Sequence, residues 1–448
     1  MQTSLELGLA QHPLIEPARV YGTIREITAQ SIKVEGLSNI AALGDRVKML
    51  EPGGGFVEGE IIKISRQFVT ITAYGQISRL GIGAKAVHLG QQEPRPTSGW
   101  IGKVLDHSGR HLDGSHAPQG DMAVSLKAAP PRNRKTIGAR LNTGLAAIDS
   151  FLPLCKGQRI GLFAGSGVGK STLLADLAKG TNADIVILAL IGERGREVRD
   201  FTQDTLGPQG MKKSIVFVAT SDEPPALKLR AAWLAMACAE YFRDQGKHVL
   251  LLFDSLTRFA EAHRSVALSA GETPSLRAFP PSTFGALAQL CERAGPGSED
   301  MGSEEIGSEG RGDITAVFSV LVAGSNMEEP VADMVRGILD GHVVLERNIA
   351  ERGRYPAIDI RRSVSRALPG CASERENKLL LHGRSLIGAY EDARTLIKAG
   401  LYQAGSDPLL DEAVEKYAKL DEFIALKNQE TAEKSFEKLS EILPKEDG

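Results

Sequence analysis

The sequence predicts an α/β protein in three folded parts: an N-terminal β-barrel, a parallel α/β domain and a C-terminal α-helical domain. Short period-two segments near the N-terminus, apolar runs alternating with helix-length stretches in the middle, and helix-spaced apolar residues at the end support this division. A chain of 448 residues also exceeds the size at which one hydrophobic core usually stops growing. We therefore expect a tail over residues 1–18, the barrel over 19–92, the α/β domain over 93–370 and the helical domain over 371–448.

The composition is that of an ordinary soluble globular protein, with 42% hydrophobic and 24% charged residues. The net charge is −3 and the pI is about 6.4, so the strongly basic character of a nucleic-acid-binding protein is missing. No apolar stretch precedes the first basic residue, Arg19, and no run of 18 or more apolar residues follows, so we expect a cytoplasmic protein. The scattered cysteines form no C-x-x-C pair, which suits a reducing compartment and argues against a disulfide framework or a zinc site: Cys155, Cys238, Cys291 and Cys371.

The barrel is predicted from four short segments with alternating apolar residues, "RVYGTIREI", "SIKVEG", "EIIKIS" and "FVTITAYG". Glycine-rich breaks such as "PGGGF" separate them, as in small barrels. Residues 1–18 show no clear period and are expected to be a loose tail.

A polar, proline-bearing linker, "QQEPRPTSG" at residues 91–99, marks the boundary of the next domain. Residues 102–116 hold two aspartates and three histidines, His107, His111 and His116. A metal cluster is conceivable there, but the interspersed glycines break any helix that would align the histidines. We therefore expect a turn-rich entry to the domain.

The central region carries five apolar runs, "RIGLF", "ADIVILALIG", "SIVFVAT", "HVLLLFD" and "DITAVFSVLV", separated by helix-length stretches. Near-continuous apolar strands indicate a parallel sheet that is covered on both faces. Ligands of such sheets bind at the carboxyl ends of the strands, so polar residues there are the first candidates for a site.

Residues 295–313 interrupt this pattern with a five-residue pseudo-repeat of Gly-Ser-Glu. The segment is acidic and lacks an apolar face, which is typical of a solvated loop. A loop that contacts a partner is the alternative interpretation.

The motif "FAGSGVGKST" begins at Phe163 and nearly matches the phosphate-binding pattern G-x-x-x-x-G-K-[ST], with Ala164 in place of the first glycine. It follows a predicted strand and opens a predicted helix, which is the context that a phosphate loop requires. Its glycines allow backbone N–H groups to converge on phosphate at a helix N-terminus. The predicted nucleotide-binding residues are Gly165, Ser166, Gly167, Val168, Gly169, Lys170, Ser171 and Thr172.

Within this loop Lys170 is expected to reach the β- and γ-phosphates of ATP, and the hydroxyl of Ser171 is expected to bind Mg²⁺. Asp254 ends the run "HVLLLFD" and is the second candidate for holding Mg²⁺, although an aspartate there could also cap a helix. Because Ser255 follows it instead of glutamate, the base that activates water must come from another segment.

Glu193 is the candidate base, because it ends the strand "DIVILALIG" and lies 23 positions after Lys170. The surrounding "ERGRE" could alone be a surface ion-pair network. Its position at a strand end beside the phosphate loop favours the catalytic interpretation.

The C-terminal region is predicted to be helical from about residue 373. Apolar residues keep helical spacing in two stretches: Leu410, Val414, Tyr417, Leu420 and Ile424, and then Phe436, Leu439 and Leu443. These stripes are expected to be core or subunit contacts.

Together, "FAGSGVGKST", "IGERGREVRDF", "LLLFDSLTRFAEAHR", "RGILDGHVVLER" and "RYPAIDIRRSVSR" resemble the protein-export ATPases related to the rotary ATPases. Within that family the chain is most similar to the flagellum-specific ATPases of bacterial type III export. The resemblance runs from about Arg19 to the C-terminus, implies a RecA-like core, and includes the alanine at position 164. It assigns Glu193 as the catalytic glutamate with Arg194 following it, Tyr355 as the aromatic on the adenine ring, and Arg366 as an arginine finger.

In rotary synthases the phosphate loop with its glutamate and the "SVSR" arginine belong to two kinds of subunit, whereas here Lys170, Glu193 and Arg366 occur in one chain. We therefore predict a homohexamer with an active site at every interface. The resemblance also implies a stator-like regulator, a central stalk-like protein, the export gate, and export substrates with their chaperones as partners. It implies a position at the inner face of the bacterial cytoplasmic membrane. Residues 295–313 look like an insertion and inherit no role from the family.

Four alternatives remain at this point. The ATPase of a virulence type III secretion system would share every catalytic motif. A catalytic rotary-synthase subunit would depend on a separate arginine donor, and a non-catalytic nucleotide-binding scaffold would be expected to lack Glu193 or Arg366. An RNA translocase would need a basic, aromatic-rich surface, and the predicted barrel has few aromatics.

Overall fold

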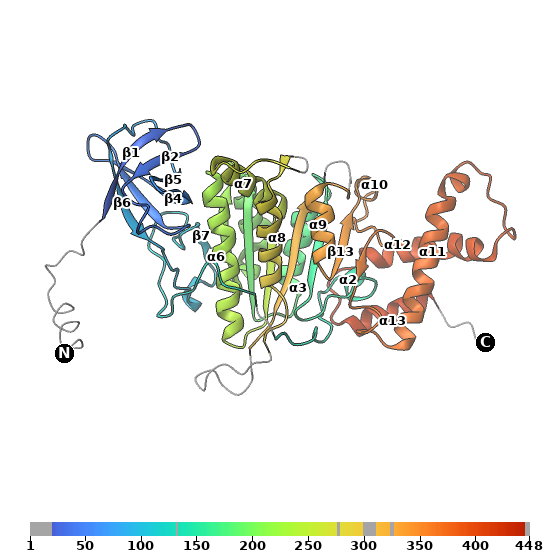
Figure 1. Cartoon of the computed structure of the whole chain (residues 1–448). Helices are drawn as coiled ribbons and strands as arrows, with labels where there is room; N and C mark the ends of the chain where they lie inside the picture. The colour runs from blue at the N-terminus through green and yellow to red at the C-terminus, as the bar shows by residue number, and fades with distance from the viewer. Residues whose placement is uncertain (1–19, 131–132, 276–277, 299–310, 323–326, 444–448) are drawn as a thin grey trace. The chain divides into compact units, whose positions relative to one another are not determined.

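The computed structural model describes residues 20–443 except for 131–132, 276–277, 299–310 and 323–326 (Figure 1). The predicted tail at 1–18 and the centre of the Gly-Ser-Glu segment therefore lie outside the described residues. The chain divides into two compact units. The first consists of the residues up to Gln92 together with Ser265–Thr273, and the second holds Glu93–Arg264 and the remainder from Pro274.

The first unit is a closed six-stranded barrel with strand order β1-β2-β5-β4-β3-β6. Its strands are β1 (Tyr21–Ile27), β2 (Ile32–Glu35), β3 (Arg46–Leu50), β4 (Phe56–Ile64), β5 (Phe68–Ala73) and β6 (Lys85–Gly90). The predicted segments became β1, β2, β4 and β5, whereas β3 and β6 were missed. In β3, Val47 and Met49 are buried and alternate with half-buried Arg46 and Lys48, so the period-two signal was present in a strand of five residues.

The second unit is built on an eight-stranded sheet with the order β14-β13-β8-β12-β11-β9-β10-β7. All neighbouring strands in it are parallel except β13 and β14, which pair antiparallel. The strands are β7 (Val104–Leu105), β8 (Arg159–Ala164), β9 (Ile185–Glu193), β10 (Ser214–Thr220), β11 (Val249–Asp254), β12 (Ile314–Leu321), β13 (Gly341–Leu345) and β14 (Val364–Ser365). The five predicted runs are β8 to β12, and the short strands β7, β13 and β14 were not predicted.

Helices cover both faces of this sheet, and β9 shows why its sequence is apolar throughout (Figure 1). Ile185, Ile187 and Ile191 point into the core shared with α6, α7, α8 and α9, whereas Val186 and Leu188 belong to the core on the opposite face. The strand is therefore buried on both sides, as expected for a parallel sheet.

The helical elements of this unit complete the two layers. They are η1 (Ser98–Trp100), α2 (Ala146–Asp149), α3 (Lys170–Gly180), α4 (Gly195–Asp200), the π-helical turn η2 (Phe201–Leu206), α5 (Gly207–Met211), α6 (Pro225–Asp244), α7 (Leu256–Ser269), α8 (Pro281–Arg293), α9 (Pro330–Ile338) and α10 (Arg347–Glu351). The last five residues of α7 belong to the barrel unit. The predicted entry at residues 102–116 is turn-rich, and Gly102, Gly109 and Gly114 there all have φ near +80°.

The C-terminal region consists of α11 (Glu374–Lys398), α12 (Pro408–Ala425) and α13 (Ala432–Ile442), as the helical spacing predicted. Ser373 caps α11 and forms a reciprocal pair of hydrogen bonds with Glu376. Leu420 and Leu439 are fully buried, and Phe423 packs edge-on against Phe151 with ring centroids 6.2 Å apart. The three helices therefore share one hydrophobic core with α3 and with the face of the sheet that α3 covers.

Candidate active site

The phosphate-binding motif lies at the carboxyl end of β8, directly before α3. Gly167 and Gly169 adopt φ values of +77° and +89°, a region that residues with a Cβ rarely enter. These conformations let the loop turn back so that backbone N–H groups gather at the start of an eleven-residue helix. Ser171 and Thr172 are exposed on the first turn of that helix, whereas Val168 is buried beneath the loop.

Three residues that the sequence placed in different segments meet at this edge of the sheet. The Nζ atom of Lys170 lies 3.2 Å from Oε1 of Glu193, at the end of β9, and also contacts the carboxylate of Asp254 at the end of β11. The lysine side chain is only 11% exposed. Burial alone would lower the pKa of Lys170, but the two carboxylates outweigh it and raise that pKa above its ordinary value. Lys170 is therefore held as a cation between two acids.

Ser319 is part of the site and was not predicted. It is fully buried on β12, and its Oγ donates a hydrogen bond of 2.5 Å to Oδ1 of Asp254. A serine in the middle of the largely apolar run "DITAVFSVLV" was the available signal. Lys170 at the start of α3 and Ser319 on β12 both contact the carboxylate of Asp254, which ends β11. These two contacts fix the orientation of that carboxylate.

Arg347 is a second residue that was missed. It is exposed at the start of α10, and its Nη2 lies 3.4 Å from the backbone oxygen of Ser166 in the phosphate loop. An arginine here adds positive charge beside the loop, where an anionic ligand would bind.

Tyr355 lies against the same loop. A Cβ placed on Gly169 would lie 3.2 Å from two carbons of the Tyr355 ring, so the backbone of the loop passes directly beside the ring. The tyrosine is 44% exposed, which leaves ring surface free for a ligand.

Two predicted residues are not brought to this cluster. The side chain of Arg194 is 79% exposed and lies 3.6 Å from Glu197, one turn along α4. Arg366 is exposed directly after β14, at the amino-terminal edge of the sheet. Its backbone N–H donates to the backbone oxygen of Asp340, which lies beside Arg159 at the start of β8.

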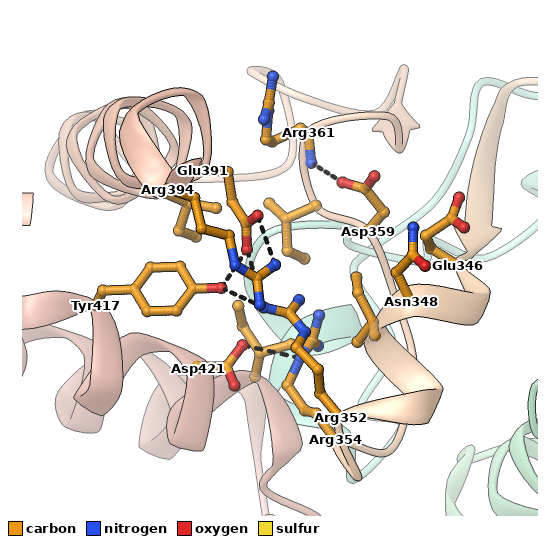
Figure 2. A pocket seen from close by; sticks show the side chains of 14 residues that line it. Glu346, Asn348, Arg352, Arg354, Asp359, Arg361, Glu391, Arg394, Tyr417 and Asp421 are labelled. Atoms are coloured by element: carbon orange, nitrogen blue, oxygen red, sulfur yellow. Dashed lines mark hydrogen bonds and ion pairs between the residues drawn. The ribbon is translucent and has the colours of Figure 1, made fainter. Parts of the chain in front are cut away.

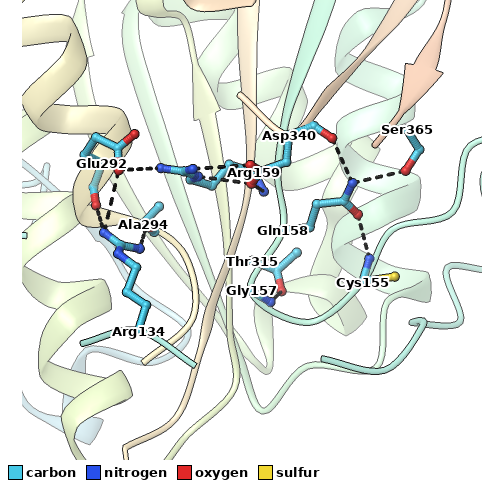
Figure 3. Close-up of polar contacts among 10 residues, drawn as sticks. All are labelled: Arg134, Cys155, Gly157, Gln158, Arg159, Glu292, Ala294, Thr315, Asp340 and Ser365. Carbon is cyan, nitrogen blue, oxygen red and sulfur yellow. Dashed lines mark hydrogen bonds and ion pairs between the residues drawn. The ribbon is translucent and has the colours of Figure 1, made fainter. Parts of the chain in front are cut away.

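The strand β8 separates Arg366 from the phosphate loop. It has six residues, and at about 3.3 Å per residue the two ends are roughly 17 Å apart. A buried network shown in Figure 3 fixes the segment before Arg366: Gln158 donates from Nε2 to the backbone oxygen of Asp340 and to Oγ of Ser365, both at 3.1 Å. Arg366 therefore cannot reach the phosphate loop of its own chain.

A separate pocket of about 260 Å³ lies between the segment after α10 and the C-terminal helices (Figure 2). Arg354 lies 2.9 Å from Asp421, and Arg352 lies 3.3 Å from Glu391, which also contacts Tyr417. Burial lowers the pKa of Arg354 and raises that of Asp421. These charges neutralise one another, so the pocket joins the segment that carries Tyr355 to α11 and α12 and does not resemble a binding site for an anion.

Among the described residues no group of three or more His, Cys, Asp or Glu side chains is placed to hold a metal ion. Within the same ranges, no helix combines the length and the apolar character needed to span a bilayer.

Family models match two parts of the chain. Residues 144–365 match the nucleotide-binding domain of the ATP synthase alpha/beta family, and residues 372–441 match the C-terminal domain of the type III secretion ATPase EscN. The first match contains the phosphate loop and both carboxylates, and the second contains α11, α12 and all of α13 except its last residue.

Curated relatives and solved structures resemble the chain over nearly its whole length. The flagellum-specific ATP synthase of Caulobacter vibrioides is 40% identical over 96% of this chain and 98% of that protein, and that of Bacillus subtilis is 39% identical over 92% of each. The assembled ATPase EscN of enteropathogenic Escherichia coli is 38% identical and superimposes with a TM-score of 0.84, covering 94% of this chain and 100% of that one. EscN in complex with its central stalk EscO gives a TM-score of 0.82 at the same identity and coverage.

The nucleotide loop, its two carboxylates, the barrel and the C-terminal helices thus occur in one architecture, and the chain belongs to the type III export branch of the ATP synthase alpha/beta family, as an ATP-hydrolysing P-loop enzyme.

Proposed function

We propose that this chain hydrolyses ATP to energise protein export through the flagellar type III apparatus, as a ring of six identical copies. The observation that carries the proposal is the division of the site within one chain. Lys170, Glu193 and Asp254 meet at one edge of the sheet, while Arg366 lies about 17 Å away at the other edge. In a heterologous ring the two edges of neighbouring copies can face each other, so each interface completes one site.

The nucleotide is proposed to bind along residues Gly165–Thr172, with its adenine on Tyr355. The loop fits a phosphate chain, because a Cβ added to Gly167 would meet nothing within 4 Å and space is open there. Lys170 would exchange its carboxylate partners for phosphate oxygens.

The residues also fit Mg²⁺. The hydroxyl of Ser171 and the carboxylate of Asp254 are oxygen donors, the ligand type that this ion prefers. When bound, the ion would neutralise charge on the β- and γ-phosphates. Ser319 holds Asp254 in place for this role.

In the proposed mechanism Glu193 orients the attacking water and receives its proton, which leaves a hydroxide-like oxygen to attack the γ-phosphorus. Lys170 balances the negative charge on the transferred group from the same chain. Arg366 of the neighbouring copy supplies the second positive charge. Arg194, which points to solvent beside Glu193, is proposed to contact the neighbour at this interface.

The flagellar assignment is supported by two flagellum-specific ATP synthases that are 39–40% identical to this chain over 92–98% of their own length. The injectisome ATPase EscN is also close, at 38% identity, so a virulence system is the second candidate. By analogy with EscN and its stalk EscO, we propose a central stalk partner. A stator-like regulator, the export gate, and substrates with their chaperones complete the proposed partners, at the inner face of the cytoplasmic membrane, with no role for nucleic acid.

Two experiments test these proposals. ATP turnover per subunit should rise steeply with protein concentration across the range in which rings assemble, and a constant value would exclude shared sites. Proteins purified with the chain from its native cells should be flagellar components. Recovery of injectisome components instead would assign it to a virulence system.

A further inference from the structure

The side chain of Gln158 connects the start of β8 to the strand end that carries Arg366. Gln158 is fully buried directly before β8, and Figure 3 shows the hydrogen bonds of its amide group. Its Oε1 accepts a hydrogen bond of 2.9 Å from the backbone N–H of Cys155. Its Nε2 donates two hydrogen bonds of 3.1 Å, one to the backbone oxygen of Asp340 and one to Oγ of Ser365. The amide therefore ties the loop before β8 to β14 and to the residue before β13.

Both acceptors of this amide continue toward Arg366. The backbone oxygen of Asp340 also accepts from the backbone N–H of Arg366, at 3.0 Å, so Gln158 and Arg366 share one acceptor. Ser365 directly precedes Arg366, and its Oγ donates a 2.7 Å hydrogen bond to the backbone oxygen of Pro153. Because backbone oxygens can only accept and a backbone N–H can only donate, the direction of each bond and the orientation of the amide are determined.

The segment of Arg366 also lies very close to β13. Gly341 begins that strand with φ of +147°, and a Cβ there would lie 2.5 Å from the backbone oxygen of Val364 and 3.4 Å from the backbone nitrogen of Arg366. Glycine is the residue that permits so close an approach. Because β14 has two residues, backbone pairing alone gives it little support, and the bonds of Gln158 and Ser365 hold it in place.

This network holds the backbone at Arg366 and leaves the side chain in solvent, since Ser365 is buried and Arg366 is exposed. We propose that Gln158 is a positioning residue for the arginine finger: its amide fixes the strand end from which Arg366 reaches the nucleotide of the neighbouring copy. The inference rests on the proposed function, in which Arg366 completes the neighbour's site. A long side chain that starts from a fixed backbone loses less freedom when it reaches its target, and orientation of this kind contributes to the rate.

The variant Gln158→Met tests this role, because it keeps an unbranched side chain of similar length without the amide. Gln158 and the phosphate loop of its own chain lie at opposite ends of β8, so the finger that a copy donates should be impaired and the loop that it presents should be spared. The kcat for ATP should fall about 10–100-fold, since a misplacement of 1 Å can cost about 10²-fold. The KM for ATP should stay within about twofold, because a finger acts in the transition state.

Mixed rings show which side of the interface is impaired. In an equal mixture with Glu193→Gln, about one quarter of the interfaces combine the intact loop of Gln158→Met with the intact finger of Glu193→Gln, so hydrolysis should recover to about one quarter of the wild-type rate. In a mixture with Arg366→Ala, every finger is either absent or misplaced, so the rate should not exceed that of Gln158→Met alone. Recovery with both partners, with neither, or with Arg366→Ala only would overturn the proposal, as would a wild-type kcat for Gln158→Met.

Two further variants separate this role from a general loss of stability. Ser365→Ala removes the oxygen that accepts from Gln158, so it should give the same pattern of recovery, and it serves as the test if Gln158→Met does not enter rings. Ser214→Ala is the matched control. Ser214 is fully buried at the start of β10, a strand that is not next to β13 or β14, and its Oγ donates a 2.7 Å hydrogen bond to the backbone oxygen of Gly210. It should keep the wild-type kcat, and a loss as large as that of Gln158→Met would overturn the proposal.

The mixture of Glu193→Gln with Arg366→Ala tells the two possible failures apart. If that mixture stays inactive, the shared site itself is wrong and the positioning role falls with it. If it recovers while the mixtures with Gln158→Met depart from the expected pattern, the shared site stands and the positioning role alone is wrong.

Discussion

Mixing two inactive variants should restore activity if each site is shared between neighbours. Glu193→Gln removes the proposed base but leaves Arg366 intact, and Arg366→Ala does the reverse. Each variant alone should be nearly inactive, because a general base contributes about 10²–10⁴ in rate and an arginine finger about 10³–10⁵. In a mixed ring, some interfaces regain both groups. At these interfaces the Arg366→Ala copy supplies the phosphate loop with an intact Glu193, and the Glu193→Gln copy supplies an intact Arg366.

The expected recovery follows from random assembly. With equal amounts of the two variants, each side of an interface has a chance of one half, so about one quarter of the interfaces should be complete. Steady-state ATP hydrolysis of rings assembled from the mixture should therefore reach about one quarter of the wild-type rate per subunit. Glu193→Gln mixed with the double variant Glu193→Gln/Arg366→Ala is the matched control, since no interface in it is complete. Mass measurement should show that the rings contain both single variants. If such mixed rings hydrolyse ATP no faster than either variant alone, the shared site is refuted.

Other predictions concern stability. Ser319→Ala should lower the free energy of unfolding by about 1.5–3 kcal/mol in urea titrations, because Asp254 loses a buried charged hydrogen bond; an unchanged midpoint would contradict this role. Phe423→Ala should cost about 3–5 kcal/mol by the same measurement, since it leaves a cavity beside Phe151. Burial lowers the pKa of His248 below its ordinary value. As the pH falls below about 6.5, this histidine therefore takes up a proton in the unfolded chain before it does so in the folded one, and the free energy of unfolding decreases. His248→Gln should remove that part of the pH dependence, and an identical pH profile in the variant would rule it out.

The sequence was most informative where one local pattern determines the structure. The apolar runs predicted strands that end near Ala164, Glu193 and Asp254, and β8, β9 and β11 do end there. Because these strands are parallel, their carboxyl ends lie at the same edge of the sheet. The position of Arg366 was not predictable in this way, because it depends on the antiparallel pairing of β13 with β14, two strands of five and two residues.

Ser319 illustrates a second limit. Its importance comes from Asp254 on the neighbouring strand, 65 positions away in the chain, and only the register of β11 with β12 brings them together. Within its own strand it is one of two small polar residues, with Thr315, among apolar ones. Contacts between strands of this kind are set by the whole sheet, so local periodicity does not reveal them.

The clasp of Lys170 by Glu193 and Asp254 has a consequence for the order of events at the site. The ammonium group of Lys170 pairs with the carboxylates of both Glu193 and Asp254, so all three charged groups already have a partner of opposite charge. We expect a triphosphate to compete better than a single phosphate or sulfate ion with the two carboxylates for Lys170, because it carries more negative charge. In the proposed mechanism the same exchange would free Glu193 to orient water and Asp254 to bind Mg²⁺, so substrate binding itself would release the two carboxylates for their proposed roles.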